Sequence, residues 1–295
     1  MDFFIQLVLA GLSVGAVYAL IGLGLNLTFW TTRVLNFGQG SVMMAGAMLT
    51  AVMVVNGVFV FIALPVALLS TALILWLIEL VGVKPMLRNS AGSMGWVVST
   101  LGAGVLLQGL ASLLFGTQAV AFPDIIFSVS DTIEFMGAYI SVQYIAVFVI
   151  CVLAVFIMEF FLHRTSWGYG VRAVAHDRDL ASLMGIPVRR VVVMSFVISG
   201  FLAGLAGVLV AQISGSVDPN FGLHLLILAF VAAVAGGLGS AWGSLVGGLV
   251  LGVLEKLVGG YVSPAAAEVV AFILLVGVLT VRPQGLFGKK DAVKV

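Results

Sequence analysis

Residues 4–30 read FIQLVLAGLSVGAVYALIGLGLNLTFW, a stretch of the chain that contains no charged side chain. A helix rises 1.5 Å per residue, so a stretch of this length is long enough to cross the ~30 Å hydrocarbon core of a bilayer. Inside a bilayer the backbone N–H and C=O groups must bond to one another, which a helix achieves within a single segment. The stretch therefore predicts a transmembrane helix.

The composition extends this prediction to the whole chain. Of the 295 residues, 62% are hydrophobic and 8% are charged, whereas soluble proteins carry roughly 25% charged residues. We predict an all-α, polytopic transmembrane bundle that forms one domain over residues 1–295. The candidate spans are 4–30, 40–56, 58–82, 94–116, 143–162, 191–212, 223–237, 241–255 and 265–281. The apolar stretch over residues 40–82 is nearly unbroken, and residues 223–255 contain segments short enough to be half-spans. Eight and nine crossings therefore both stay open.

Basic residues indicate the orientation. In the nine-span interpretation, all Lys and Arg residues except Lys256, which is beside Glu255, fall in alternate loops: Arg33; Lys84 and Arg88; Arg164, Arg172, Arg178, Arg189 and Arg190; Arg282, Lys289, Lys290 and Lys294. The intervening loops carry Asp2, then Asp124, Asp131 and Glu134, then Asp218. Basic loops are retained in the cytoplasm. We therefore predict a periplasmic N-terminus and a cytoplasmic C-terminus.

Glycine recurs at a spacing that favours close helix packing. The pairs four residues apart are Gly11 and Gly15, Gly200 and Gly204, Gly243 and Gly247, and Gly248 and Gly252. In lipid, small residues let two helix backbones approach each other, and this contact drives association. The pairs predict either a tightly packed bundle or a seam between subunits.

No set of residues with the spacing of a catalytic or metal site is present. His163, His176 and His224 lie far apart, Cys151 is the single cysteine, and no phosphate-binding G-x-x-x-x-G-K-[ST] motif occurs. We expect no metal, no cofactor, no ATPase site and no enzymatic activity. A net charge of +1 gives no reason to expect nucleic acid as a partner. No ionisable residue lies near the middle of a span, which weakens the alternative of a stand-alone secondary transporter or channel.

The most informative loop is residues 163–190, the longest of the loops predicted to be cytoplasmic. Asp177 can cap a short helix at its N-terminus, while Gly185 and Pro187 can end it. An apolar stripe on this helix would consist of Leu180, Leu183 and Met184. The stripe could rest on lipid, on the chain's own bundle or in a groove of a partner. A solvated basic connector is an equally good interpretation of the loop.

Several motifs resemble the LivH-type permease family of ABC importers for branched-chain amino acids. They are GVRAVAHDRDLASLMGIP (170–187), FVISGFLAGLAGVL (196–209), GLSVGAVYALIGLGL (11–25), VLNFGQG (34–40) and RPQGLFG (282–288). The similarity runs nearly end to end, and the ordered set is more specific than any one motif. The family commonly has Asn-Phe-Ala-His-Gly where this chain has Asn-Phe-Gly-Gln-Gly at 36–40, so a role of that histidine is in doubt here.

The resemblance implies a permease subunit in the bacterial inner membrane that uses alternating access. Its partners would be a second permease subunit of the related LivM type, two cytoplasmic ATPases and a periplasmic substrate-binding protein. The loop helix would be the coupling helix that docks on an ATPase, with the residues Asp177, Arg178, Asp179, Leu180, Ala181, Leu183, Met184, Gly185, Ile186 and Pro187. The resemblance does not decide which amino acid or amide is carried. It favours a heterodimer of permease subunits, but a homodimer stays open.

Three amides are candidates for the translocation path: Asn26, Asn36 and Gln39. An amide at membrane depth needs a partner, because burying it unpaired is costly. For both asparagines a hydrogen bond between helices is the favoured role, and contact with substrate or water is the alternative.

Overall fold

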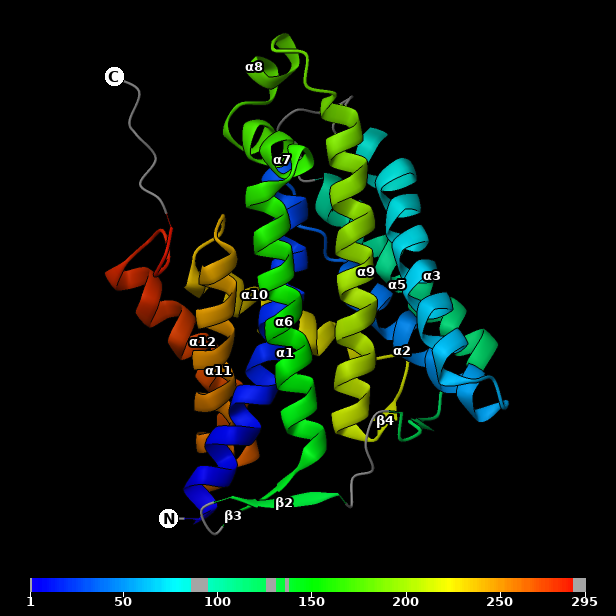
Figure 1. Cartoon of the computed structure of the whole chain (residues 1–295), viewed down its shortest axis with the longest axis vertical. Coiled ribbons are helices and arrows are strands. Elements are labelled where there is room, and N and C mark those ends of the chain that lie inside the picture. Colours follow the sequence, from blue (N-terminus) through cyan, green and yellow to red (C-terminus); the bar gives the residue numbers. More distant parts are fainter. Residues whose placement is uncertain (1, 86–94, 126–130, 136–137, 289–295) are drawn as a thin grey trace. The chain divides into compact units, whose positions relative to one another are not determined.

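The computed structural model describes residues 2–85, 95–125, 131–135 and 138–288, and helices dominate it (Figure 1). A helix forms at each predicted apolar segment: α1 (Asp2–Thr32), α2 (Gln39–Val55), α3 (Val60–Ile78), α5 (Gly95–Phe115), α6 (Val142–Arg164), α9 (Val188–Ser214), α10 (Phe221–Gly236), α11 (Ala241–Tyr261) and α12 (Pro264–Val281). A π-helical turn, η1 (Glu79–Val83), continues α3. The prediction of an all-α polytopic fold is confirmed.

Helix lengths divide these segments into two groups. Among the described residues, seven helices are long and apolar enough to cross a membrane, with α3 and η1 taken together. The other two, α2 and α10, have 17 and 16 residues and are shorter than a full span. The number of crossings and the orientation stay predictions, and Arg88, Lys289, Lys290 and Lys294 lie outside the described residues.

The predicted end of α11 was wrong. The helix continues past residue 255 to Tyr261, so Glu255 and Lys256 lie within it and not in a loop. The Tyr18 hydroxyl of α1 donates a hydrogen bond of 2.8 Å to Glu255 Oε2. Glutamate and lysine are both good helix formers, so the two charges give no reason for the helix to end here.

In the part of the chain that the structure describes, two small antiparallel sheets occupy connections for which the sequence predicted no regular structure. β1 (Val120–Ala121) pairs with β4 (Ser216–Val217), and β2 (Thr132–Phe135) pairs with β3 (Ala138–Ser141). The first sheet joins the α5–α6 connection to the α9–α10 connection. Both connections are predicted to lie outside the membrane on the same side, which agrees with the alternation of the loops.

The chain forms two compact units, divided within α1, α6 and α10. The first unit comprises residues Met1–Asn26, Ile126–Phe156 and Ile227–Val295. A glycine seam holds α1 to α11 in this unit: a Cβ on Gly15 would lie 2.6 Å from the Gly248 carbonyl oxygen, and one on Gly11 would lie 2.6 Å from Val253 Cα. Backbone therefore touches backbone, and the packed-bundle interpretation of these glycines is correct.

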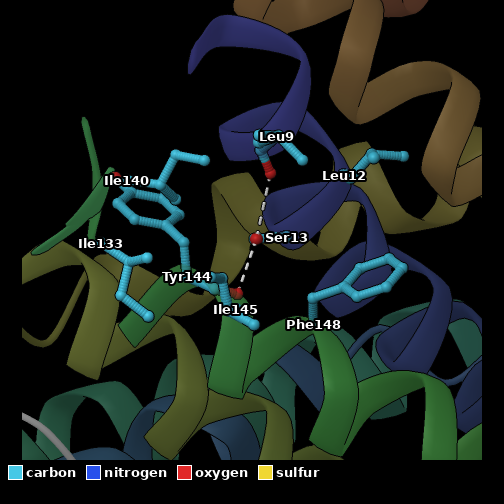
Figure 2. Close-up of a pocket in the computed structure, with 8 residues that line it drawn as sticks. All are labelled: Leu9, Leu12, Ser13, Ile133, Ile140, Tyr144, Ile145 and Phe148. Carbon is cyan, nitrogen blue, oxygen red and sulfur yellow. Dashed lines mark hydrogen bonds between the residues drawn. The ribbon is translucent and has the colours of Figure 1, made fainter. Parts of the chain in front are cut away.

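An apolar cavity of about 260 Å³ also belongs to the first unit. Figure 2 shows its lining, which is Leu9, Leu12, Ser13, Ile133, Ile140, Tyr144, Ile145 and Phe148. The Ser13 hydroxyl is bonded to the backbone oxygens of Leu9 (3.1 Å) and Tyr144 (2.7 Å). The lining therefore offers a ligand little besides apolar surface. On α6 of the same unit, Cys151 is fully buried.

The second unit comprises Leu27–Ile125 and Ile157–Leu226. Here α9 packs against α2 and α3 through small residues, because a Cβ on Gly200 would meet the Thr71 carbonyl oxygen at 2.6 Å. A cluster of buried side chains joins α2, α5, α9 and the small sheet: Met44, Ala47, Met48, Ala51, Ala111, Phe122, Val208, Ala211 and Val217.

Candidate functional site

The loop between α6 and α9 contains two helices, α7 (Ser166–His176) and α8 (Arg178–Leu183), at the end of the second unit where α9 begins (Figure 1). Sequence reasoning missed α7, because Gly168 and Gly170 have low helix propensity. The structure explains why one of them is needed: a Cβ on Gly168 would collide with the backbone of Leu162. The signal for α7 was Thr165, whose hydroxyl accepts a hydrogen bond of 3.1 Å from the Gly168 N–H.

The capping residues predicted for α8 are confirmed. Asp177 Oδ1 accepts hydrogen bonds of 3.0 Å from the N–H groups of Asp179 and Leu180. At the other end Gly185 has φ +82°, the left-handed conformation that glycine adopts without strain. The N–H of Ile186 bonds to the Ala181 carbonyl and that of Gly185 to the Ser182 carbonyl, each at 3.0 Å, which is the Schellman pattern.

The apolar stripe of α8 points away from the rest of the described chain. Leu180 is 55% exposed, Leu183 82% and Met184 83%. Ala181, next to Leu180 on the helix, is buried, and Ile186 is half-buried. The described part of the chain's own bundle therefore does not cover this stripe, which excludes one of the three surfaces that the stripe could contact. A lipid surface and a partner protein remain, as does the interpretation of the loop as a solvated basic connector.

One side chain ties α7 to the connection between α1 and α2. The Arg33 guanidinium donates a hydrogen bond of 2.8 Å to the carbonyl of Ala175, in the last turn of α7. A cation is favourable there because the C-terminal end of a helix carries partial negative charge. Arg33 has φ +59° and is followed by residues 34–38, which lead directly to α2. The bond therefore joins the last turn of α7 to the segment that leads into α2.

Asn26 has the helix-to-helix role that the sequence favoured. Its Nδ2 donates to the Ser244 hydroxyl of α11 at 2.5 Å, and its Oδ1 accepts from the Gly239 N–H at 3.4 Å. All three residues belong to the first unit. Both the nitrogen and the oxygen of the amide are hydrogen-bonded, and these bonds hold α1 against the start of α11.

Asn36 and Gln39 lie together at the start of α2, in the second unit. Asn36 Oδ1 accepts a hydrogen bond of 3.0 Å from the Gly38 N–H, but its Nδ2 is buried and has no partner among the described residues. Gln39 Oε1 accepts from the Ser199 hydroxyl of α9 at 3.3 Å. The two candidates that the structure brings together therefore differ, since only Asn36 keeps an unused donor.

Comparisons with known proteins point in one direction. The family described as "Branched-chain amino acid transport system / permease component" matches residues 7–279. The high-affinity branched-chain amino acid transport system permease protein LivH of Salmonella typhimurium is 34% identical, covering 99% of this chain and 98% of its own length. The corresponding protein BraD of Pseudomonas aeruginosa is 31% identical over the same shares.

A solved structure shares the fold. It is that of PsaBC from Streptococcus pneumoniae in complex with a Fab, one chain of which superimposes with a TM-score of 0.53 at 17% sequence identity. The match covers 97% of this chain and 94% of that chain. At this identity the likeness concerns the fold alone.

Proposed function

Because the chain belongs to the permease component family of branched-chain amino acid transport systems, we propose that it is the membrane-spanning permease subunit of an ATP-driven importer for branched-chain or related amino acids. It works in the bacterial inner membrane as one permease domain. Its partners are a second permease subunit of the LivM type, two cytoplasmic ATPases and a periplasmic binding protein that delivers the substrate.

The observation that carries the ATP-driven part of this proposal is the exposed apolar stripe of α8. Leu183 and Met184 are held on a rigidly capped turn, away from the chain's own core. Exposed apolar side chains gathered in one place mark a surface that binds another molecule. A groove on an ATPase subunit accounts for the stripe and supplies the nucleotide chemistry from a separate chain.

The contacts of α7 suggest how such docking reaches the membrane. Closure of the ATPases pulls on residues 177–187, and α7 follows because only Asp177 separates it from α8. Arg33 then transmits the displacement to residues 34–38. The start of α2 then changes position relative to α9, which opens one side of the path and closes the other.

Two contacts within the units support the predicted sidedness. Arg33 meets Ala175, and both lie in loops predicted to be cytoplasmic. Gln6 Nε2 donates to the Tyr139 carbonyl at 3.0 Å, and both lie at the side predicted to be periplasmic, where Figure 1 shows the N-terminus beside β3. Contacts between loops of opposite predicted sides would have argued against the alternation.

Charge placed on the stripe tests the docking. Leu183→Asp combined with Met184→Asp would bury two carboxylates in an apolar groove, which costs several kcal/mol. We expect the variant to insert into the membrane and to pair with the second permease. Copurification of the ATPases and ATP-dependent uptake in proteoliposomes should both fall to background.

The matched control is Ser182→Ala, which changes an exposed residue of the same helix and should leave uptake unchanged. If the double variant keeps its ATPases and its uptake, or if it fails to insert, the coupling assignment is wrong. Uptake driven by an ion gradient through the chain reconstituted alone would instead identify a secondary transporter.

A further inference from the structure

Glu79, where α3 continues into η1, is a buried carboxylate with an unused oxygen. Its side chain is 4% exposed, and its Oε2 atom has no hydrogen-bond partner among the described residues. Two other carboxylates within long helices do have partners: Glu159 Oε1 lies 3.3 Å from His163 Nδ1, and Glu255 Oε2 accepts the bond from Tyr18. Burying a carboxylate without a partner costs free energy, so a partner for Glu79 is expected in some state of the protein.

The backbone at Glu79 is irregular. The N–H of Lys84 bonds to the Glu79 carbonyl oxygen, five residues back, which is the π-helical pattern. Such turns within α-helices occur frequently at functional sites. The turn also lies against α5, because a Cβ on Gly82 would be 2.7 Å from the Ser99 hydroxyl oxygen. The carboxylate therefore stands where the helical repeat of α3 changes.

The end of α3 lies beside the start of α9. A Cβ on Gly204 would collide with the Thr71 side chain, and a Cβ on Gly200, one turn earlier in α9, would meet Leu75 Cβ at 2.9 Å. The contacts move forward along α3 as they move back along α9, so the two helices are antiparallel. Glu79 therefore points the chain toward the first turns of α9, at the end of the second unit where Figure 1 shows α7 and α8.

Three basic side chains act electrostatically on this carboxylate. The effect of Arg189 is the largest, followed by the effects of Lys84 and Arg178. In the described chain, no ion pair within 4.0 Å joins any of the three to Glu79. The cations are thus close enough to attract the carboxylate, but they do not touch it in this structure.

Two of these cations stand at the ends of residues 177–187, the coupling segment that the proposed function assigns to the ATPase. Arg178 is the first residue of α8, and Arg189 lies in the first turn of α9, two residues after Pro187. Both side chains are exposed. Lys84 lies on the same helix as Glu79, so its distance from the carboxylate does not depend on the loop. A displacement of the coupling segment would instead change the distances of Arg178 and Arg189.

We propose that Glu79 anchors the coupling segment to α3 through an ion pair with Arg189, which is open in this structure and closes when the ATPases move the segment. The inference rests on the proposed function and deepens it, because it adds a route to α3 beside the Arg33 route to α2. Arg189 supplies the donor that Glu79 Oε2 lacks, and hydrogen bonds between charged groups are among the strong ones. Only the displaced state satisfies the carboxylate, so the pair favours that state. Glu79 is a positioning residue that acts on α3 and not on the substrate.

Glu79→Gln tests the pair, because it removes the charge and nearly keeps the shape. In proteoliposomes with the complete importer and its binding protein, we expect the L-leucine carried per ATP hydrolysed to fall at least about fivefold, the lower end of typical coupling between sites. Arg189→Gln should have the same effect, and the double variant should lose no more than either single variant, because both changes remove one interaction. Additive losses, or a ratio that Glu79→Gln leaves unchanged, would overturn the inference.

The matched control is Arg190→Gln, which removes an exposed charge from the neighbouring position and should transport as wild type does. A loss as large as that of Arg189→Gln would show that the total charge of the loop matters and not the pair, which would also overturn the inference. Glu79→Asp keeps the charge and should retain part of the coupling that Glu79→Gln loses.

The melting temperature of the detergent-solubilised permease chain separates this role from a structural one. Because the pair is open here, no direct partner offsets the cost of burying the Glu79 charge. Glu79→Gln should therefore leave the melting temperature unchanged or raise it, and a lower value would overturn the proposal. Wild-type complexes that lack ATP-driven uptake would contradict the proposed function instead. A working importer in which Glu79→Gln is neutral would contradict this inference alone, so the two failures are distinguishable.

Discussion

The capped helix α8 and the start of α2 are both stabilised by hydrogen bonds and glycine, but in opposite ways. All capping bonds of α8 join residues within ten positions of one another, and its large side chains are exposed. The start of α2 is buried, and its tightest contact joins Gly40 to Gly222, far apart in the chain. A locally built element can keep its shape while its partner surface is altered, whereas an element held by distant contacts changes whenever its neighbours move.

The largest difference between the two regions should come from adding one methyl group. Gly222→Ala places a Cβ against the Gly40 carbonyl, and such overpacking costs about 1–3 kcal/mol or more. We expect a lower melting temperature and a smaller folded fraction of the detergent-solubilised chain. Gly109→Ala on α5 is the matched control, because no heavy atom of the described residues lies within 4 Å of the added Cβ. Equal stability of the two variants would show that α2 and α10 do not cross backbone to backbone.

The next effect should be confined to α8. Gly185→Ala forces alanine to φ +82°, which costs about 1–2 kcal/mol, because Cβ then crowds the neighbouring carbonyl. We expect binding of the ATPases to weaken roughly 5- to 30-fold, while the melting temperature of the permease chain alone stays unchanged. Gly185→Asn should lose less, since asparagine tolerates this conformation. A drop in chain stability would contradict the view that α8 is built locally.

A smaller effect is expected at the other end of α8. Asp177→Ala removes the acceptor for two backbone N–H groups, a change that costs about 1 kcal/mol for a typical helix cap. ATPase binding should weaken about fivefold, which pull-down titration can measure. Asp177→Asn keeps an acceptor oxygen and should bind nearly as wild type. If Asp177→Asn fails as badly as Asp177→Ala, the negative charge and not the cap is what matters.

The smallest effect concerns the link between the two regions. Arg33→Ala loses the bond to the Ala175 carbonyl, and because Arg33 is exposed the loss should be under about 1 kcal/mol. ATP hydrolysis should continue while the amount of amino acid carried per ATP falls, and Arg33→Lys should restore part of it. An unchanged ratio of uptake to hydrolysis would remove Arg33 from the coupling route.

This contrast also explains what could be predicted from the sequence. The caps of α8 were found because Asp177, Gly185 and Pro187 act on neighbours a few residues away. The nine apolar helices of the described residues were predicted because a helix in lipid needs length and apolarity, which the sequence shows directly. Both features depend on local rules that any segment of sequence carries.

The start of α2 was only partly predicted, because its meaning depends on residues elsewhere. Asn36 and Gln39 were candidates as polar residues at depth, but nothing near them indicates that Gly222 lies against Gly40. Similarly, nothing in the sequence near Glu255 indicates that the Tyr18 hydroxyl of α1 donates a hydrogen bond to it. The small sheet of β1 and β4 pairs strands of two residues, too short to leave a period in the sequence.

Because Cys151 is buried, the natural protein can serve as the unlabelled control in a cysteine-labelling experiment. The sequence contains one cysteine, and its side chain is 0% exposed within α6, so a polar maleimide that cannot enter the bundle should leave the natural protein unlabelled. A thiol introduced at the exposed positions Ser182 or Tyr139 would then be the sole reactive group. Reagent added to intact spheroplasts should react with a cysteine at 139 and spare one at 182, and inside-out vesicles should reverse that pattern. Each loop can therefore be assigned to its side of the membrane without first removing the native thiol.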